Sequence, residues 1–446
     1  MRRIPPRSTD PPSALPPNLS FVLGLSPSVM TLGLANMRAL LGHLGHPEQS
    51  FPSVLIAGTN GKGSVSAFVA AILQANGKRV GWYTSPHIFD VTERICVDGE
   101  PVTLGEMEEA ASRIAPLHDD IGFSYFEALT AIAFHIFARR KIDIAVLEVG
   151  LGGRFDATNV VEPVVSVLTS VALDHRRILG DSVEEILREK LGIARPGVPL
   201  VCGRLSPGLG AIVEERAARD RIPLHMVDSI GSAEPIEISL DGMRARLRTG
   251  TADYGEIRLP FIGEPQLGNA LVSVRVAELV LGRVERLADA AGTVRLRGRF
   301  EVVRAGGKVF VFDVAHNDEA LIATLSTLVS LSPREDNAII LGVMRRKELR
   351  EFPDVLAPRV RRAYLIEPVA EEAYSGPELL QTLGVRSLRD RGVDVAVEKR
   401  FTEEGDWMKF IDRVLAAENS CRVILVTGSH RTVEVVGKRI PGMENR

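Results

Sequence analysis

The stretch Gly58-Thr59-Asn60-Gly61-Lys62-Gly63-Ser64 decides the fold, because it lies between a predicted buried strand, residues 53–57, and a predicted helix, residues 65–75. Glycines let backbone N–H groups turn toward a polyphosphate, and a helix N-terminus adds positive potential. Lys62 would reach the β- and γ-phosphates, and Ser64 is placed for a phosphate or its Mg²⁺. The spacing is shorter than the common G-x-x-x-x-G-K-[ST] form. A glycine-rich turn without a ligand is the alternative interpretation.

Outward from this turn, short β-branched runs alternate with longer helical patterns over residues 52–203, which indicates βαβ units of a mostly parallel sheet. Alternation over residues 236–261 predicts a small antiparallel insertion, and a helix is expected over 266–281. A second βαβ series begins after Ala290. Further strands are expected at 142–149, 164–169, 198–202, 309–312, 338–341, 363–366, 393–397 and 423–426, and helices at 126–139, 182–194 and 319–329.

The chain has 446 residues, more than one hydrophobic core usually organises, so two α/β domains are expected. Six prolines in the first 18 residues predict a flexible tail over 1–18. We predict a first domain over 19–294, with the glycine-rich turn and a mostly parallel sheet. A smaller α/β domain is expected over 295–446.

The composition argues against several classes of partner and site. Net charge is −3, which gives no bulk attraction to nucleic acid or to an anionic membrane. No segment reaches the ~20 apolar residues of a membrane span. The three cysteines are far apart and lack C-x-x-C spacing, so reduced thiols in a cytoplasm fit better than disulfides or a zinc site.

Glu148 and the pair Asp174-His175 follow two of the expected strands and should emerge at the same edge of the sheet. A carboxylate at the end of a buried strand is costly unless it meets a cation or donors. A metal ligand is therefore one interpretation of Glu148, and a capping glutamate is the other. A lone histidine is usually structural, and Mg²⁺ prefers oxygen ligands, so spacing alone does not predict His175 as a ligand.

The run Asp313-Val314-Ala315-His316-Asn317 closes what is expected to be the first strand of the second domain. Loops at the carboxyl ends of parallel strands commonly bind ligands. Asp313 could accept hydrogen bonds from a ribose, and His316 could face an anionic substrate. Capping of the next helix by Asn317 or Asp318 is the competing explanation.

Taken together, these segments resemble the folylpolyglutamate synthase and dihydrofolate synthase family of the Mur ligase superfamily. The matches run in order from about Leu32 to Val436. The run from Glu148 to Asn159 matches the family's EVGLGGRxDATN motif nearly letter for letter. The other matching segments are 44–48, 84–87, 92–95, 124–127, 169–180, 189–193, 298–301, 313–317 and 427–429.

The resemblance implies roles for individual residues. It implies catalytic roles for Lys62, Lys190 and His316, and Lys190 matches a lysine that family members carbamylate into a metal-binding carboxylate. Two Mg²⁺ sites are therefore expected, one of them through carbamylated Lys190. The implied ATP contacts are Gly58, Thr59, Asn60, Gly61, Lys62, Gly63, Ser64, Asn269, Arg299 and Asp313, and the implied metal ligands are Ser85, Glu148 and His175. The implied substrate contacts are Pro86, His87, Thr92, Glu93, Arg94, Phe126 and Glu127, with His316 and Ser429 near the incoming glutamate.

Several positions depart from the family pattern. Pro265 replaces a histidine, Val314 replaces a glycine, and Leu191 replaces an alanine beside Lys190. The run 345–348 replaces an Asp-Lys-Asp type motif, and His430 stands where an apolar residue is expected. The departures cluster around the second domain and its contacts. ATP use is therefore a firmer expectation than the identity of the acceptor.

The function implied is ATP-dependent ligation of L-glutamate to dihydropteroate, to folates, or to both, through an acyl phosphate. The protein would be a cytoplasmic monomer that binds small molecules, without nucleic-acid or membrane partners. One rival is a cell-wall ligase of the same superfamily, against which the matches at 84–87 and 92–95 count. The other is a degenerate protein that binds folate or nucleotide without turnover.

Overall fold

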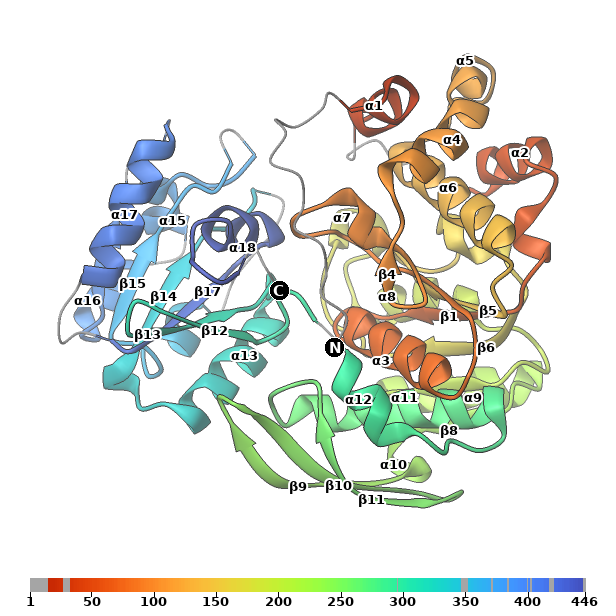
Figure 1. Ribbon diagram of the computed structural model, residues 1–446. Helices are drawn as coiled ribbons and strands as arrows, with labels where there is room; N and C mark the ends of the chain where they lie inside the picture. Colours follow the sequence, from red (N-terminus) through yellow and green to blue (C-terminus); the bar gives the residue numbers. More distant parts are fainter. Residues whose placement is uncertain are drawn as a thin grey trace.

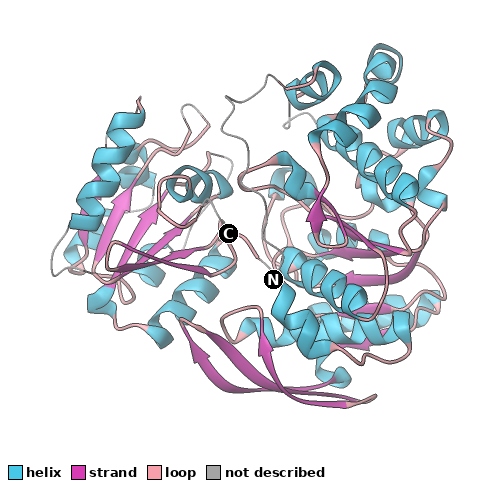
Figure 2. Ribbon diagram, in the orientation of Figure 1, coloured by secondary structure: helices cyan, strands magenta, loops and turns pink. Residues whose placement is uncertain are grey.

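The computed structural model describes residues 15–26, 33–294, 296–345, 352–369, 372–382, 385–398, 400–401, 403–416 and 421–443. Two α/β bodies face each other, and a small three-stranded sheet lies along one side (Figures 1 and 2). The expected fold class, two α/β domains with mostly parallel sheets, is confirmed.

An eight-stranded sheet in the order β4-β3-β2-β5-β1-β6-β7-β8 forms the first body. The strand β1 is central, and it pairs in parallel with β5 and β6. Helices cover both faces, which is why these strands are continuous apolar runs. Only β3 and β4 run antiparallel to their neighbours. The strands are β1 Ser53–Ala57, β2 Val80–Tyr83, β3 Ile95–Val97, β4 Glu100–Pro101, β5 Ile144–Glu148, β6 Pro163–Leu168, β7 Leu200–Cys202 and β8 Leu224–Met226.

Two hydrophobic cores flank this sheet. The helix α3, Lys62–Ala75, packs on one face with α11, Pro265–Leu281, and α12, Leu287–Thr293. The helix α6, Tyr125–Arg140, belongs to the core of the other face. The remaining helices of this body are α1 Pro17–Gly24, α2 Ala35–His43, α4 Leu104–Ile114, α5 His118–Ile121, α7 Arg176–Leu179, α8 Val183–Lys190, α9 Pro207–Asp220 and α10 Val227–Ile230.

The predicted antiparallel insertion is present as a sheet in the order β11-β10-β9. Its strands are β9 Gly231–Ser239, β10 Gly242–Thr249 and β11 Asp253–Leu259. Alternate residues of β10, namely Met243, Ala245 and Leu247, are fully buried against the core that contains α3 and α11. The insertion thereby covers α11 and α12, which pack on α3, the helix that follows the glycine-rich turn.

A six-stranded sheet in the order β12-β13-β17-β14-β15-β16 forms the second body. The expectation that the strand ending before Asp313 is the first of this domain was wrong, because that strand is β13, and β12 precedes it and pairs with it antiparallel. The glycines between those strands, Gly306 and Gly307, make a tight hairpin that the βαβ pattern concealed. The elements are β12 Glu301–Ala305, β13 Lys308–Phe312, α13 Asp318–Leu331, β14 Asn337–Leu341, α14 Phe352–Leu356, β15 Arg362–Leu365, α15 Gly376–Thr382, α16 Val385–Asp390, β16 Asp394–Val397, α17 Glu404–Ala416, β17 Val423–Thr427 and α18 His430–Gly437.

Two sequence predictions fall partly outside the described residues. Residues 1–14 of the expected tail and residues 346–348 of the altered 345–348 motif lie there. Within the expected tail, Pro17 already begins α1, so this helix starts before the predicted end of the tail at residue 18. Among the helices of the described ranges, none is long and apolar enough to cross a membrane.

Candidate active site

The glycine-rich turn after β1 is packed so closely that two of its glycines cannot be replaced without a clash. A Cβ on Gly58 would lie 1.9 Å from Thr169 Oγ1, and one on Gly61 would lie 2.9 Å from Asn269 Oδ1. Both glycines have positive φ, +151° and +86° respectively. The turn therefore requires glycine for backbone shape and for close approach. It also places Asn269, on α11, directly against the turn.

Two lysines converge on this turn. Lys62, the first residue of α3, donates from Nζ to the Gly58 carbonyl at 3.0 Å and to the Thr59 carbonyl at 3.1 Å. Lys190, at the end of α8, is buried and donates from Nζ to the same Gly58 carbonyl at 2.8 Å. The structure thus gathers two of the predicted catalytic residues at the glycine-rich turn.

Glu148 ends β5 with its side chain buried beside the turn. Its Oε2 accepts hydrogen bonds from the Thr84 hydroxyl and from the Ser85 N–H, the latter at 3.3 Å. A Cβ on Gly63 would lie 3.7 Å from this same oxygen. The carboxylate therefore faces the helix start where phosphate oxygens would lie, which suits a hard cation.

The predicted metal ligands share one region without forming a compact cluster. His175 lies with its Nε2 3.8 Å from Asp174 Oδ1, and its side chain is 42% exposed. No group of three or more His, Cys, Asp and Glu residues gathers as a metal site in the described part of the chain. The predicted set contains only two such residues, Glu148 and His175, and adds the hydroxyl of Ser85.

A cavity of about 940 Å³ unites these groups with the second domain. The first domain contributes Ser85, Pro86 and most of the glycine-rich turn. The second contributes Asp313 and His316. Arg299 lies at the junction, and a Cβ on Gly63 would lie 3.3 Å from its Nη2. The predicted residues that line the cavity are Gly58, Thr59, Asn60, Gly61, Lys62, Ser64, Ser85, Pro86, Glu148, His175, Lys190, Asn269, Arg299, Asp313 and His316.

Both carboxylate oxygens of Asp313 accept hydrogen bonds from the protein backbone. This residue accepts them from the Phe300 N–H at 2.8 Å and the Ala315 N–H at 2.9 Å. Burial raises its pKa, while the Arg299 guanidinium acts in the opposite direction. Its contacts hold the loop that presents His316, so any contact with a nucleotide would be an additional one.

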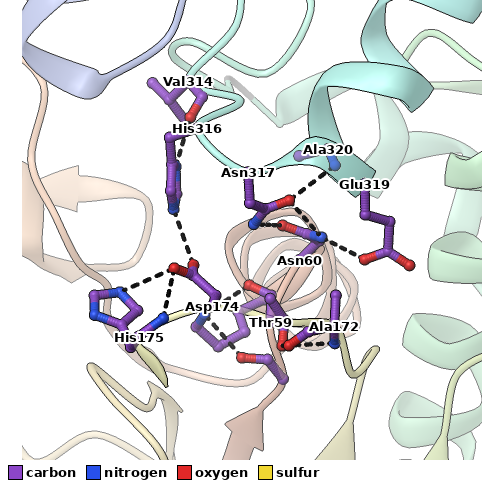
Figure 3. A network of polar contacts seen from close by, with 12 residues as sticks. Thr59, Asn60, Ala172, Asp174, His175, Val314, His316, Asn317, Glu319 and Ala320 are labelled. Carbon is purple, nitrogen blue, oxygen red and sulfur yellow. Dashed lines mark hydrogen bonds and ion pairs between the residues drawn. The ribbon is translucent and has the colours of Figure 1, made fainter. Parts of the chain in front are cut away.

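A network of polar contacts joins the two domains across the cavity (Figure 3). His316 Nε2 lies 3.3 Å from Asp174 Oδ2, while its Nδ1 lies 2.8 Å from the Val314 carbonyl oxygen. Asn60 donates to Glu319 at 2.6 Å and accepts from Asn317 at 3.1 Å. The glycine-rich turn thus touches the start of α13 directly.

The sequence matches two family models in the same order as the two bodies. The model for the Mur ligase middle domain matches residues 56–277, and that for the Mur ligase glutamate ligase domain matches 298–430. The dihydrofolate synthase/folylpolyglutamate synthase of Bacillus subtilis (strain 168) is 31% identical, over 92% of this chain and 95% of that protein. The chain belongs to the folylpolyglutamate synthase and dihydrofolate synthase family. It is accordingly an ATP-dependent ligase.

Solved structures of this family agree with the fold. A Mycobacterium tuberculosis folylpolyglutamate synthase complexed with ADP and AMPPCP has a TM-score of 0.81 at 29% identity, covering 91% of this chain and 95% of that one. An Escherichia coli protein in complex with DHPP and ADP has a TM-score of 0.79 at 27% identity, covering 94% and 96%. These relatives bind small molecules, and among them are adenine nucleotides.

The segment that matches the family's substrate loop is held by its own side chains. Glu93 accepts from the N–H groups of Ile88, Phe89 and Asp90. Arg94 is buried, and its Nε donates to His87 Nδ1 at 2.8 Å. Burial and the neighbouring Arg94 lower the pKa of His87 to about 4. Thr92 bonds to Asp90 through its N–H and its hydroxyl.

The other predicted substrate residues also have structural partners. Glu127 caps α6, where its Oε2 accepts from the Ser124 N–H at 2.8 Å, and Phe126 packs so tightly that a Cβ on Gly150 would lie 2.5 Å from its ring. Ser429 caps α18 by accepting from the Thr432 N–H at 3.1 Å. Of the predicted substrate contacts, Pro86 and His316 line the cavity, whereas His87, Thr92, Glu93, Arg94, Phe126, Glu127 and Ser429 do not.

Sequence reasoning missed three groups that hold the turn. The hydroxyl of Thr169 donates to the Asn60 carbonyl at 2.6 Å, and Ser170 Oγ accepts from the Asn60 N–H at 2.9 Å. Glu319 bonds to the side chain of the same residue. The position of Thr169 and Ser170 after the strand next to β1 was an available signal. No sequence motif indicated the role of Glu319, because its partner, Asn60, lies in the other domain.

Proposed function

We propose that this chain ligates L-glutamate to dihydropteroate and to reduced folates that already carry glutamate, with ATP as the energy source. The observation that carries the proposal is the single cavity that joins the glycine-rich turn, Glu148 and Lys190 to Arg299 and His316 of the facing side. A ligase must hold a nucleotide and two further substrates in one water-poor space.

A carboxylate resists attack by an amine because its charge is delocalised and oxide is a very poor leaving group. Transfer of the ATP γ-phosphate to a carboxylate oxygen gives an acyl phosphate and ADP. Lys62 and Arg299 would neutralise charge on the transferring group, and the backbone N–H groups of the turn would hold the phosphates. The chain then needs no nucleophile of its own.

The amine of glutamate attacks the acyl carbon, the amide bond forms, and inorganic phosphate leaves. This half of the reaction needs the glutamate close to the acyl phosphate and water kept out. We assign His316 near the incoming glutamate, whereas Ser429, the other residue that the resemblance implied, caps α18 outside the cavity. The contact between His316 and Asp174 supports this assignment, because it holds His316 where the two domains meet at the cavity.

We assign Mg²⁺ to the side of the cavity that holds Ser85, Glu148 and His175. The donor set fits a hard cation through a buried carboxylate oxygen and a hydroxyl, with His175 as the softer member. When bound, Mg²⁺ would supply charge neutralisation between phosphate oxygens. Carbamylation of Lys190 would give a second metal an anionic oxygen in place of an ammonium that repels it.

Lys190 can be tested separately. Intact-mass measurement of active protein, prepared with and without bicarbonate, should show the carbamate only where activity is high. Activity that does not depend on bicarbonate, together with an unmodified lysine in high-resolution density, would remove the second site from the proposal.

The acceptor is tested by ADP release with ATP, Mg²⁺ and glutamate, adding dihydropteroate or tetrahydrofolate in separate reactions and identifying the products by mass. We expect turnover with both. Turnover with one alone would reduce the claim to a monofunctional enzyme. Turnover with neither, in folded protein, would favour a degenerate binding protein and give Pro265 and Val314 a functional meaning.

We further propose that the enzyme works as a cytoplasmic monomer. All three cysteines are free and buried, as expected for a protein that needs no disulfide. Sedimentation of the purified chain with and without nucleotide would test the monomer, and a mass near twice 48.5 kDa would contradict it.

A further inference from the structure

The segment 85–90 spans the distance from the cavity to the core of the second domain. Ser85 and Pro86 line the cavity. Ile88 is only 6% exposed and belongs to a hydrophobic core of the other body, to which β12, β13, β14, β15, β17, α17 and α18 contribute. We propose that Ile88 and Phe89 form an anchor through which the second domain positions Ser85 and Pro86 against the cavity.

Ile88 enters a contact made by three apolar side chains from separate parts of the fold. A Cβ on Gly298 would lie 2.7 Å from Ile88 Cδ1, 3.0 Å from Val314 Cγ1 and 3.4 Å from Val433 Cγ1. The three side chains therefore close around one glycine, whose φ is +59°. Val314 is one of the departures from the family pattern, and here it is buried beside a residue of the first domain.

Phe89 is held from two sides by the second body. The Arg297 guanidinium lies 5.5 Å from the centre of its ring, and a Cβ on Gly437 would lie 3.0 Å from its Cζ. Arg297 is fixed in turn, because its Nη1 donates to the Met443 carbonyl at 2.9 Å. The ring is therefore clasped between the chain before β12 and the end of α18.

The segment that carries both anchor residues is stiff. Glu93 accepts from the N–H groups of Ile88 at 2.9 Å and Phe89 at 3.1 Å. At the other end, Ser85 N–H donates to Glu148 Oε2 at 3.3 Å. A shift of the second domain at Ile88 would therefore be passed to Ser85 and Glu148 instead of being absorbed by a slack loop.

This role rests on the proposed function, because it concerns the acyl phosphate. With the anchor in place, Ser85 and Pro86 stay against the cavity while the second domain closes. Without it, water reaches the acyl phosphate and attacks either the acyl carbon or the phosphorus. The bond between the attacked atom and the bridging oxygen breaks, and the free carboxylate and inorganic phosphate are released. ATP is then consumed without amide formation. Ile88 and Phe89 are positioning residues in this scheme.

The experiment measures phosphate released per glutamate incorporated in Ile88→Ala and Phe89→Ala. The parent should give a ratio near unity, and each variant a ratio raised at least about twofold, because exclusion of water governs the partition. The ratio does not depend on the fraction of folded enzyme, so lost stability alone cannot move it. A ratio unchanged in both variants would refute the anchor.

Val303→Ala is the matched control, because Val303 is 1% exposed in the same core but belongs to β12. It should lower stability without changing the ratio, and Ile88→Leu should restore the ratio. An equal rise in Val303→Ala would mean general loosening and overturn the proposal.

Hydrogen exchange separates failure of the anchor from failure of the proposed function. The amides of Ser85 and His87 should exchange faster in Phe89→Ala than in the parent or in Val303→Ala, with no substrate present. Equal exchange refutes the anchor whatever the protein ligates. Faster exchange in a chain that incorporates no glutamate supports the anchor and sinks the proposed function alone.

Discussion

Two strand-to-helix turns meet across the cavity, and they are built on opposite plans. The turn after β1 is rich in glycine, and its shape depends on positive φ at Gly58 and Gly61. The turn after β13 carries polar side chains, which are committed to the protein through Asp313 and through Asn317, the cap of α13. The first offers backbone to a ligand, whereas the second holds its own shape and reaches toward the first.

This difference explains why the two turns tolerate change differently. A Cβ at Gly58 would collide with Thr169, so the first turn cannot vary there. In the second turn, Val314 replaces a glycine and fits, because its side chain finds the apolar contact with Ile88 around Gly298. Substitutions in the turn after β1 should therefore differ in the size and kind of their effects from substitutions in the turn after β13.

The largest effect is expected for Lys62→Ala. The lysine is the cation on the first turn that would follow the transferring phosphate, so we expect kcat to fall at least about a hundredfold. The melting temperature should stay close to that of the parent, and Lys78→Ala, which removes an exposed lysine of the same domain, should change neither quantity. A near-normal kcat in Lys62→Ala would sink the assignment of the phosphate site.

Glu148→Gln should come next. The substitution keeps the size of the side chain and an oxygen acceptor for Thr84 and Ser85, but a neutral amide is a poorer ligand for a hard cation. The Mg²⁺ concentration for half-maximal activity should rise about tenfold or more. A titration that overlays the parent's would exclude Glu148 as a ligand.

These two tests concern residues that the sequence identified, and the reason is local. The turn at 58–64 and the carboxylate at 148 follow buried strands, and the edge where parallel strands end is predictable from the alternation of strands and helices. The fold class, the antiparallel insertion and most strands were found in the same way. The hairpin was missed because the first strand expected in the second domain, at 309–312, is β13, and β12 before it was not predicted.

Contacts between the domains could not be predicted, because they depend on how two separately folded surfaces meet. Ile88 lies in a loop of the first domain, yet it is buried in the core of the second. Thr92 and Glu93 match a substrate loop, yet their polar groups hold that loop together. Motif matching shows which residues recur, and only the structure shows which of them line the cavity.

A smaller effect is expected where the two turns touch. Glu319→Ala removes the acceptor for the Asn60 side chain, which lies at 2.6 Å. A partly exposed hydrogen bond to a charged group contributes about 1 kcal/mol, so KM for glutamate should rise roughly threefold to fivefold. ATP binding to the first turn should change little. Glu319→Gln keeps an acceptor and serves as the matched variant, and an equal KM in all three proteins would show that this contact has no part in closure.

The smallest effect concerns two histidines, His87 of the first domain and His430 of the second. Burial and nearby cations lower the pKa of His87 to about 4 and that of His430 to about 3, from an ordinary 6.5. The unfolded chain therefore binds protons at these positions below pH 6.5, while the folded chain does not. It follows that stability is lost as the pH falls from 6.5 toward about 4, and that it rises again with pH toward neutrality.

His430→Gln tests this linkage on the face where the family pattern has an apolar residue. The midpoint temperature of the parent should fall between pH 7 and pH 5, and the variant should fall by less, because one proton-linked site is gone. At pH 7 the two proteins should be similar, since both histidines are then neutral in the folded and mostly neutral in the unfolded state. His43→Gln, at an exposed position on α2, is the control and should follow the parent. If His430→Gln also follows the parent from pH 7 to pH 5, His430 adds nothing to the loss of stability in acid. The slope between pH 7 and pH 5 would then arise from His87 and other histidines, because the linkage of carboxylates lies at lower pH.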